Sequence, residues 1–360
     1  MKRPLAITMV LAVLWSATVP AQELYRVPFP PPRPAPSDTL EMMIIGDVMM
    51  HTPQMKHDCR RFFADIAPAL AAADIAVANM EFSLGGEPYT GYPAFSAPDY
   101  IAPYVAGCGI DVFLTANNHI LDRRSTGLER TLGIYRSMSD SVLFTGSASS
   151  AEEHMKVNPL VVRSHGISIA LVNFTYDTNG ITVKGWPNTS YQDRDSVHAA
   201  IMRAKERNAD FIIALPHWGE EYHLRHSEEQ RRWAEWLVSE GVDAIVGGHP
   251  HVVQDTTHIE GVPVIYSLGN AVSNMSRENT RLELAVRLKF VKNGFSGEKV
   301  MLEPELLPMW CTLPGRLCDS YATIFIKEWA TRRSEWLIPS DHDDMTATWK
   351  RVREATGIGR

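Results

Sequence analysis

Residues 244–270 read AIVGGHPHVVQDTTHIEGVPVIYSLGN. A short apolar run, Ala244 to Val246, meets two glycines, and His249-Pro250-His251 follows. A buried strand that ends in glycine releases its backbone at the carboxyl edge of a sheet, where α/β proteins place their chemistry. Because neutral imidazole is the commonest metal ligand, two histidines one residue apart indicate a metal-binding loop. The alternative for this pair alone is a loop with two exposed histidines.

Four other apolar runs end in side chains of the same kind. With the first run, the expected strands are 40–45, 74–78, 111–115, 210–215 and 243–248. In the same order, the polar residues that follow them are Asp47; Asn79 and Glu81; Asn118 and His119; His217; and His249 and His251. Any one of these residues is more often a cap, a turn or a packed side chain. Together, carboxylate, amide and imidazole groups suit one or two divalent ions of Zn, Mn or Fe, and contain too much nitrogen for calcium.

The rest of the pattern alternates strands with helices. A helix is expected within 54–73, and helices are expected at 100–106, 125–137, 190–208 and 227–240. Short strands are expected at 142–145 and 262–266, a hairpin at 157–163 and 167–174, and an antiparallel strand at 281–291. This alternation predicts a largely parallel sheet covered by helices. Residues 82–99 form a long loop beside the expected site. The tail after Pro304 is less patterned, and we expect it to cap the fold.

Composition limits the classes of function. The 360 residues are 45% hydrophobic and 21% charged, as in a globular chain, and they could form one large domain or two ordinary ones. The formal net charge of −7 provides no basic surface for nucleic acid, so we expect no nucleic-acid partner.

The amino-terminal segment has the features of an export signal. Lys2 and Arg3 precede an apolar core at 5–15, and Val19-Pro20-Ala21 has small residues at the usual cleavage positions. This predicts a signal peptide at 1–21, a proline-rich linker at 22–39, and a location in the periplasm or cell envelope. An uncleaved anchor is the alternative. Disulfides persist in such compartments, but four cysteines (Cys59, Cys108, Cys311 and Cys318) allow three pairings, and the sequence selects none.

At the strand ends the sequence resembles the bacterial capsule-synthesis protein CapA family, associated with poly-γ-glutamate capsules. The matching motifs are Gly46-Asp47-Val48-Met49, Asn79-Met80-Glu81, Ala116 to Asp122, His217 to Tyr222, Gly248-His249-Pro250-His251 and Tyr266 to Asn270. They cover about residues 41 to 275. The resemblance implies a four-layer α/β/β/α sandwich of the calcineurin-like metallophosphoesterase superfamily, here assigned to residues 40–300, with residues 301–360 as an extension that packs on the domain.

The resemblance also implies roles for individual residues. Carried onto this chain, Asp47 and His251 hold one metal ion, and Asn118, His217 and His249 hold the other. Glu81 bridges both, in place of the superfamily's bridging aspartate. His119 resembles the catalytic acid that serves the leaving group, and Asp122 could orient its imidazole. The activity implied is metal-dependent hydrolysis of a phosphoester, amide or ester centre in capsule or exopolymer biosynthesis.

Two departures from the superfamily pattern keep other functions open. Met49 stands where the first motif has a histidine, and His51 could substitute unless it points elsewhere. Arg123 and Arg124 follow Asp122, either as a solvated helix start or as a clamp for carboxylate or phosphate. One alternative is a non-catalytic partner in polymer export, bound to acidic polymer or to membrane-bound synthesis and export subunits. The other is a general periplasmic metallophosphatase, and a γ-glutamyl substrate fits the enzyme reading as well.

Overall fold

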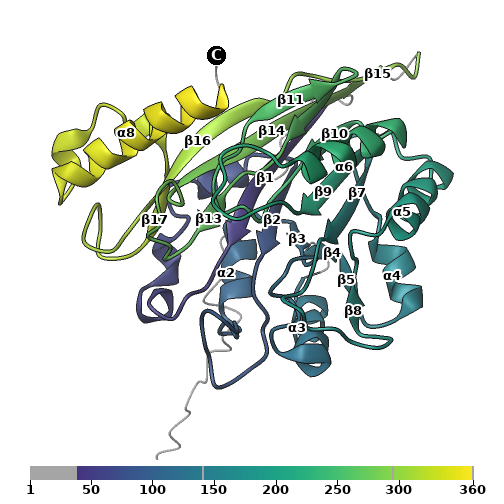
Figure 1. Cartoon of the computed structure of the whole chain (residues 1–360), viewed down its shortest axis with the longest axis horizontal. Helices are drawn as coiled ribbons and strands as arrows, with labels where there is room; N and C mark the ends of the chain where they lie inside the picture. The colour runs from purple at the N-terminus through teal and green to yellow at the C-terminus, as the bar shows by residue number, and fades with distance from the viewer. Residues whose placement is uncertain (1–38, 140–141, 294–295, 359–360) are drawn as a thin grey trace, which may run out of the picture.

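Two β-sheets form the centre of the computed structural model, which describes residues 39–139, 142–293 and 296–358 (Figure 1). Within these residues, the nine strands of the larger sheet are β1 (Thr39–Val48), β2 (Ile75–Met80), β3 (Val112–Leu114), β4 (Leu143–Thr145), β13 (Asn270–Val272), β14 (Leu282–Lys292), β15 (Lys299–Met301), β16 (Glu305–Thr312) and β17 (Ala322–Phe325). The six strands described for the smaller sheet are β6 (Leu160–Ser164), β7 (Ile167–Thr175), β9 (Phe211–His217), β10 (Ala244–Val246), β11 (Thr256–Ile259) and β12 (Val262–Ile265).

The strand order places parallel strands at the middle of both sheets. The larger sheet runs β17–β16–β14–β1–β2–β3–β4, and the smaller runs β11–β12–β10–β9–β7–β6. The pairs β1–β2, β2–β3, β7–β9 and β9–β10 are all parallel, so their carboxyl ends lie at common edges. β14 pairs with β1 in antiparallel register, as its alternating sequence predicts. The predicted hairpin is also confirmed, because β6 and β7 pair across a turn at His165 and Gly166.

Alternate residues of each strand face different layers. On β1, Met42 and Ile44 join the apolar cluster between the sheets, whereas Met43 and Ile45 join the cluster beneath the helices α2 (Ile101–Gly107) and α3 (Arg124–Ser137). The smaller sheet likewise buries its outer face under α5 (Arg194–Glu206) and α6 (Glu228–Ser239). Figure 1 shows these helices on the outer sides of the two sheets. The four-layer α/β/β/α sandwich is therefore confirmed.

The segment 54–73 contains a helix, as predicted, but this helix is only four residues long. This segment forms three short pieces, η2 (Gln54–Lys56), η3 (Cys59–Arg61) and α1 (Ala67–Leu70). His57 and Asp58 are extended between the first two pieces, and the Asp58 carboxylate accepts a hydrogen bond from the Arg60 amide as a new cap. Short local caps compete with one continuous helix, and apolar residues alone do not reveal them.

The boundaries of two other elements also differ from the prediction. The helix expected from Ser190 starts at Arg194, because the Asp193 side chain caps it by accepting from the Ser196 amide. Upstream of Ser190, β8 (Asn188–Thr189) pairs with β5 (Ser147–Ala148) instead. The short helix α4 (Ala151–Val157) was not predicted, since none of its residues is buried and it carries no apolar stripe.

The carboxyl-terminal segment builds part of the larger sheet. β16 pairs with β14 and β17 pairs with β16, so residues 305–325 extend the sheet. α7 (Ile326–Trp329) and η4 (Arg333–Glu335) then lead to α8 (Pro339–Thr356), which lies along β16 in Figure 1. Met345 and Val352 of α8 join the apolar cluster between the sheets. The tail therefore covers the inter-sheet face where the smaller sheet does not reach.

The expected signal peptide (1–21) and nearly all of the linker (22–39) lie outside the described residues. Within the described residues, no helix is both long and apolar enough to cross a bilayer. All four cysteines are free: Cys59, Cys108 and Cys311 are buried, and Cys318 is partly exposed. None of the three possible pairings is formed in the structure, and the buried Cys311 thiol faces the Ser273 carbonyl.

A buried ion pair fixes α8 to the sheet. Both guanidinium nitrogens at the end of Arg281 donate to the Asp341 carboxylate, at 2.7 and 2.6 Å, and the Asp341 side chain is 5% exposed. Removing one partner of a buried pair leaves the other charge uncompensated. We therefore expect Asp341→Asn to lower the free energy of unfolding by ~3 kcal/mol, measured by chemical denaturation.

The matched control is Asp343→Asn, two residues further along the same helix. Asp343 pairs with Arg333 on the surface, where water screens the charges, so this variant should unfold close to the parent protein. Equal destabilisation by both variants would contradict the role given to the Arg281–Asp341 pair.

Candidate metal centre

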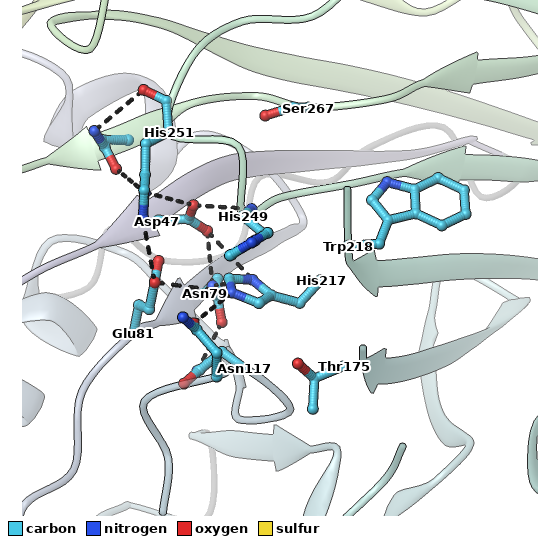
Figure 2. A network of polar contacts seen from close by, with 12 residues as sticks. Asp47, Asn79, Glu81, Asn117, Thr175, His217, Trp218, His249, His251 and Ser267 are labelled. Atoms are coloured by element: carbon cyan, nitrogen blue, oxygen red, sulfur yellow. Dashed lines mark hydrogen bonds and ion pairs between the residues drawn. The ribbon is translucent and has the colours of Figure 1, made fainter. Parts of the chain in front are cut away.

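The residues of the centre come from the carboxyl ends of strands in both sheets. Asp47 ends β1, and Asn79 and Glu81 lie at the end of β2 and just beyond it. Asn118 and His119 follow β3, and His217 is the last residue of β9. His249 and His251 follow β10. The side chains singled out by the sequence therefore lie at one edge of the sandwich, and Figure 2 shows several of them converging.

Glycine lets the histidine loop approach the larger sheet. A Cβ on Gly248 would lie 2.8 Å from Asp47 Oδ1, so a larger residue would collide with the carboxylate. The backbone N–H of His249 donates to Asp47 Oδ2 at 3.1 Å. His249 and His251 both have positive φ, 97° and 57°, a region that non-glycine residues seldom adopt. Local strain is therefore accepted where the two imidazoles are aimed inward.

A chain of amides holds the Asp47 carboxylate. Asn79 Nδ2 donates to Asp47 Oδ1 at 2.7 Å and lies 3.2 Å from His217 Nδ1. Asn117 Nδ2 donates to Asn79 Oδ1 at 3.0 Å and to the Met80 carbonyl at 2.9 Å. The network, drawn in Figure 2, fixes the carboxylate in one orientation while its oxygens keep lone pairs for a further ligand.

Two overlapping groups of ligand atoms share Glu81. Asp47, Glu81 and His251 form one group, and Glu81, His217 and His249 form the other; within each group the atoms lie within 4.8 Å of one another. Glu81 Oε1 is 3.7 Å from His251 Nε2 and 3.8 Å from His217 Nε2. These groups match the division between two metal ions that the resemblance implies.

Neighbouring amides orient the histidines. His217 Nε2 lies 2.9 Å from Asn118 Oδ1, which places Asn118 beside the second group. His251 Nδ1 lies 2.8 Å from Asn270 Oδ1. An amide oxygen accepts only, so Nδ1 of His251 donates and its Nε2 keeps a lone pair that faces Glu81. Asn270, the last residue of the Tyr266 to Asn270 motif, therefore fixes the tautomer of His251.

The Glu81 carboxylate has no hydrogen-bond partner. Its side chain is fully buried, and both oxygens are unpaired, as is Nδ1 of His249. Burial raises the pKa of Glu81 well above its usual range, and the nearby charges of Asp47 and Glu221 raise it further. An unpaired buried carboxyl is costly. A divalent cation would remove that cost, and the oxygen and imidazole donors fit zinc, manganese or iron.

The histidines are neutral and therefore able to coordinate. Burial lowers the pKa of His217 and His249 well below the usual value, and neighbouring histidines lower both further. Burial lowers the pKa of His251 to about 4, although Asp47 opposes this shift. Burial also raises the pKa of Asp47. Neutral imidazoles offer lone pairs without competition from a proton at physiological pH.

His119 and Asp122 form a buried pair beside the two groups. His119 Nδ1 lies 2.7 Å from Asp122 Oδ2, and their side chains are 5% and 2% exposed. The same Asp122 oxygen accepts from the Phe95 backbone amide at 2.7 Å, and the Phe95 ring meets the imidazole edge-on at 4.7 Å. His119 is absent from the two ligand groups that share Glu81. Its ring is thus oriented by a carboxylate and packed from the side.

The open questions at Met49, His51 and Arg123 have structural answers. Met49 is fully buried in the cluster beneath the helices. His51 Nδ1 lies 3.1 Å from Gln54 Oε1, and its ring packs edge-on against Phe95, so His51 is not among the grouped ligand atoms of the described residues. The Arg123 guanidinium binds the Pro88 carbonyl and the Thr90 hydroxyl. It therefore fastens the 82–99 loop and does not act as a free clamp.

Two further side chains at this edge were not predicted. Tyr176 and Asn179 follow β7, which ends at the same edge as β9. The centroids of the Tyr176 and His249 rings lie 4.5 Å apart. Asn118 Nδ2 donates to Asn179 Oδ1 at 3.3 Å, and Asn179 Nδ2 lies 3.3 Å from His119 Nδ1. The predicted strand at 167–174 ends two residues before Tyr176, so the polar residues after it were a signal that could have revealed them.

The two aromatic residues of the His217 motif differ in their surroundings. Trp218 is 1% exposed and donates through Nε1 to the Tyr266 carbonyl at 3.0 Å, so it belongs to the core. Tyr222 is partly exposed, with its ring 6.2 Å from His251 and the Arg277 guanidinium 4.2 Å above it. Only Tyr222 of this pair borders the metal-ligand groups.

The layered sandwich and the histidine and carboxylate groups at its edge agree with the fold and the kind of site that the resemblance implies. The family described as bacterial capsule synthesis protein PGA_cap matches residues 41–275, which is more than half of the chain. The chain therefore belongs to this family.

Relatives in the family carry capsule-related names. The chain is 27% identical to the capsule biosynthesis protein CapA of Bacillus anthracis over 274 residues, 72% of this chain and 66% of that protein. It is 27% identical to the PGA biosynthesis protein CapA of Bacillus subtilis over 315 residues, 81% of this chain and 76% of that protein. The chain thus spans about two thirds to three quarters of the length of these relatives.

Solved structures with similarity to this fold include nucleotidases. The putative 5'-nucleotidase of Staphylococcus aureus is 14% identical, with a TM-score of 0.49 over 75% of this chain and 54% of that chain. The 5'-nucleotidase precursor of Thermus thermophilus is also 14% identical, with a TM-score of 0.48 over 88% of this chain and 59% of that chain. The chain therefore spans little more than half of each nucleotidase.

The raised pKa of Glu81 predicts proton release on metal binding. The carboxyl stays protonated at pH values above 4.5, where an ordinary glutamate is ionised, but only the carboxylate can hold a cation. Uptake of Mn²⁺ should therefore release a proton, and affinity should increase as the pH rises through this range. Titration calorimetry in buffers of different ionisation enthalpy measures the released proton.

Glu81→Gln should abolish this proton release. Glu283→Gln is the matched control, because Glu283 is also a fully buried carboxyl with a raised pKa but lies outside the ligand groups. Equal proton release by Glu81→Gln and the parent protein would show that Glu81 does not take up the cation.

Proposed function

We propose that this protein is an exported metal-dependent hydrolase that acts in capsule or poly-γ-glutamate biosynthesis. The observation that carries the proposal is the Glu81 carboxylate, buried without a hydrogen-bond partner between two groups of ligand atoms. Burying an unpaired carboxylate destabilises a protein, whereas a bound metal ion offsets this free-energy cost. Family membership supports the connection with capsule synthesis, but a fold alone does not fix a substrate.

In this proposal the chain holds one or two divalent ions. Asp47 and His251 bind at one side, Asn118, His217 and His249 at the other, and Glu81 between them. When bound, such ions polarise a phosphoryl or acyl oxygen and favour ionisation of water. The chain keeps the imidazoles neutral by burial and fixes the Asp47 carboxylate through Asn79.

His119 serves as the general acid in this proposal. The Asp122 carboxylate 2.7 Å from Nδ1 accepts a hydrogen bond from that nitrogen and stabilises the imidazolium, which carries the transferable proton on Nε2. Phe95 packs against the ring and keeps it from rotating away. The imidazole can then deliver a proton to the leaving group without binding a metal ion itself.

The substrate is a phosphoester or a γ-glutamyl bond of an acidic polymer. The names of the Bacillus relatives refer to capsule and PGA biosynthesis, which supports a polymer of this kind. Membrane-bound subunits of polymer synthesis or export are the proposed partners. The acidic net charge does not favour a nucleic-acid partner. Screening phosphoesters and γ-glutamyl peptides against the metal-loaded protein identifies the bond that is cleaved.

Export would follow from cleavage of the signal at 1–21. Intact mass of the protein recovered from a bacterial envelope should then correspond to a chain that lacks about the first twenty residues, a usual signal length. Recovery of the full-length chain in the membrane fraction would instead identify an uncleaved anchor.

The change His119→Asn tests catalysis directly. It removes the acid but no proposed metal ligand, so metal content and the fold should be retained. Turnover should fall by ~10²–10⁴-fold, the usual contribution of a general acid. The measurements are steady-state hydrolysis, metal analysis and, in cells, capsule production.

His198→Asn is the matched control, because His198 also has Nδ1 2.7 Å from a carboxylate, that of Glu240, but at the surface. It should leave turnover unchanged. Normal capsule with His119→Asn but none with His217→Ala would reject catalysis and favour the alternative, a non-catalytic partner in polymer export. Loss of metal in His119→Asn would make His119 a ligand.

A further inference from the structure

The loop that follows β9 carries a carboxylate with no role in the proposed function. Residues 217–222 read His-Trp-Gly-Glu-Glu-Tyr, and Glu221 is exposed. Backbone hydrogen bonds fasten both ends of this loop to the histidine loop: the Trp218 amide donates to the Gly248 carbonyl at 3.1 Å, and the Tyr222 amide to the Pro250 carbonyl at 2.8 Å. Glu221 is therefore held beside His249 and His251 by the main chain.

Glu221 forms a third group with these two histidines. One carboxylate oxygen of Glu221 and one ring nitrogen each of His249 and His251 all lie within 4.8 Å of one another. The group shares His249 with the Glu81–His217–His249 group and His251 with the Asp47–Glu81–His251 group. Glu81 and Glu221 thus both lie close to these two histidines, one buried and the other at the surface.

A second observation indicates that this place receives a ligand. Nδ1 of His249 is buried, and the residue is only 2% exposed, yet this nitrogen has no hydrogen-bond partner. Buried imidazole nitrogens are normally satisfied by a donor, an acceptor or a metal. His249, one of the two histidines grouped with Glu221, thus keeps a ring nitrogen without a partner.

The first ligand group has room for another donor. Asp47, Glu81 and His251 supply three side chains, and zinc in proteins has at least four ligands, one of which is water or substrate in a catalytic site. Met49 is buried in the apolar cluster and His51 is engaged with Gln54, so neither is placed to add one. Charge points the same way, because two carboxylates only half neutralise two divalent cations.

We propose that Glu221 is an additional carboxylate ligand of the metal centre, completing from the solvent side the coordination of the ion held by Asp47, Glu81 and His251. The inference rests on the metal centre of the proposed function and adds a ligand to it. An oxygen donor from the loop after β9 then takes the place of the histidine that the superfamily pattern has at Met49, directly after β1.

Glu221→Gln tests the assignment, with Glu220→Gln as its matched control. Both changes replace an exposed carboxylate by an amide of the same size in adjacent positions. Glu220 lies near His223, at 3.7 Å, and belongs to none of the three ligand groups. The chelator-treated full chain is titrated with Mn²⁺ by calorimetry, and electron paramagnetic resonance reports whether bound ions are magnetically coupled.

The parent protein and Glu220→Gln should bind Mn²⁺ alike, and Glu221→Gln should lose one equivalent or bind it at least ~10-fold more weakly, with loss of coupling. Thermal unfolding without metal should be the same for all three. Unchanged stoichiometry, affinity and coupling in Glu221→Gln would overturn the assignment of Glu221 alone. Absence of Mn²⁺, Zn²⁺ and Fe²⁺ binding by the parent protein would overturn the metal centre and, with it, the proposed function.

Discussion

The contact between Gly248 and the Asp47 carboxylate determines how the two sheets meet. Asp47 ends a strand of the larger sheet, and the loop of His249 leaves a strand of the smaller one. Only the missing side chain of Gly248 allows this approach, and the His249 amide converts it into a hydrogen bond. The Asp47 carboxylate accepts hydrogen bonds from both the Asn79 side chain and the His249 backbone. These two bonds fix the ligand residues of one sheet relative to those of the other.

Much of this arrangement follows from local sequence rules. Apolar runs that end in Asp47, Glu81, His217 and His249 could be recognised as strands, and parallel strands bring their carboxyl ends together. The broken helix at 54–73 could not be predicted, because local caps and extended residues decide it. The strands at 305–312 and 322–325 were also missed, since they add to a sheet whose edge is visible only in three dimensions.

Side-chain direction was the other limit of prediction. Sequence spacing could place His51 near Asp47, but the hydrogen bond to Gln54 turns it aside. Spacing likewise left Arg123 open, whereas the structure engages it with the 82–99 loop. Asn270 is the reverse case, a motif residue without a predicted role that orients His251. In each case a hydrogen-bond partner outside the residue's own motif decides.

The pairing of β1 with β14 has a consequence for how the chain acquires its structure. The family match ends at residue 275, yet seven consecutive residues of β1, from Thr39 to Ile45, pair with β14 residues beyond that limit. Contacts between distant parts of a chain slow folding, because loop entropy is lost before they form. β1 therefore gains this neighbour only when residues 282–292 are available to pair with it. Until then this edge of β1 is open, and unpaired strand edges favour association with other chains.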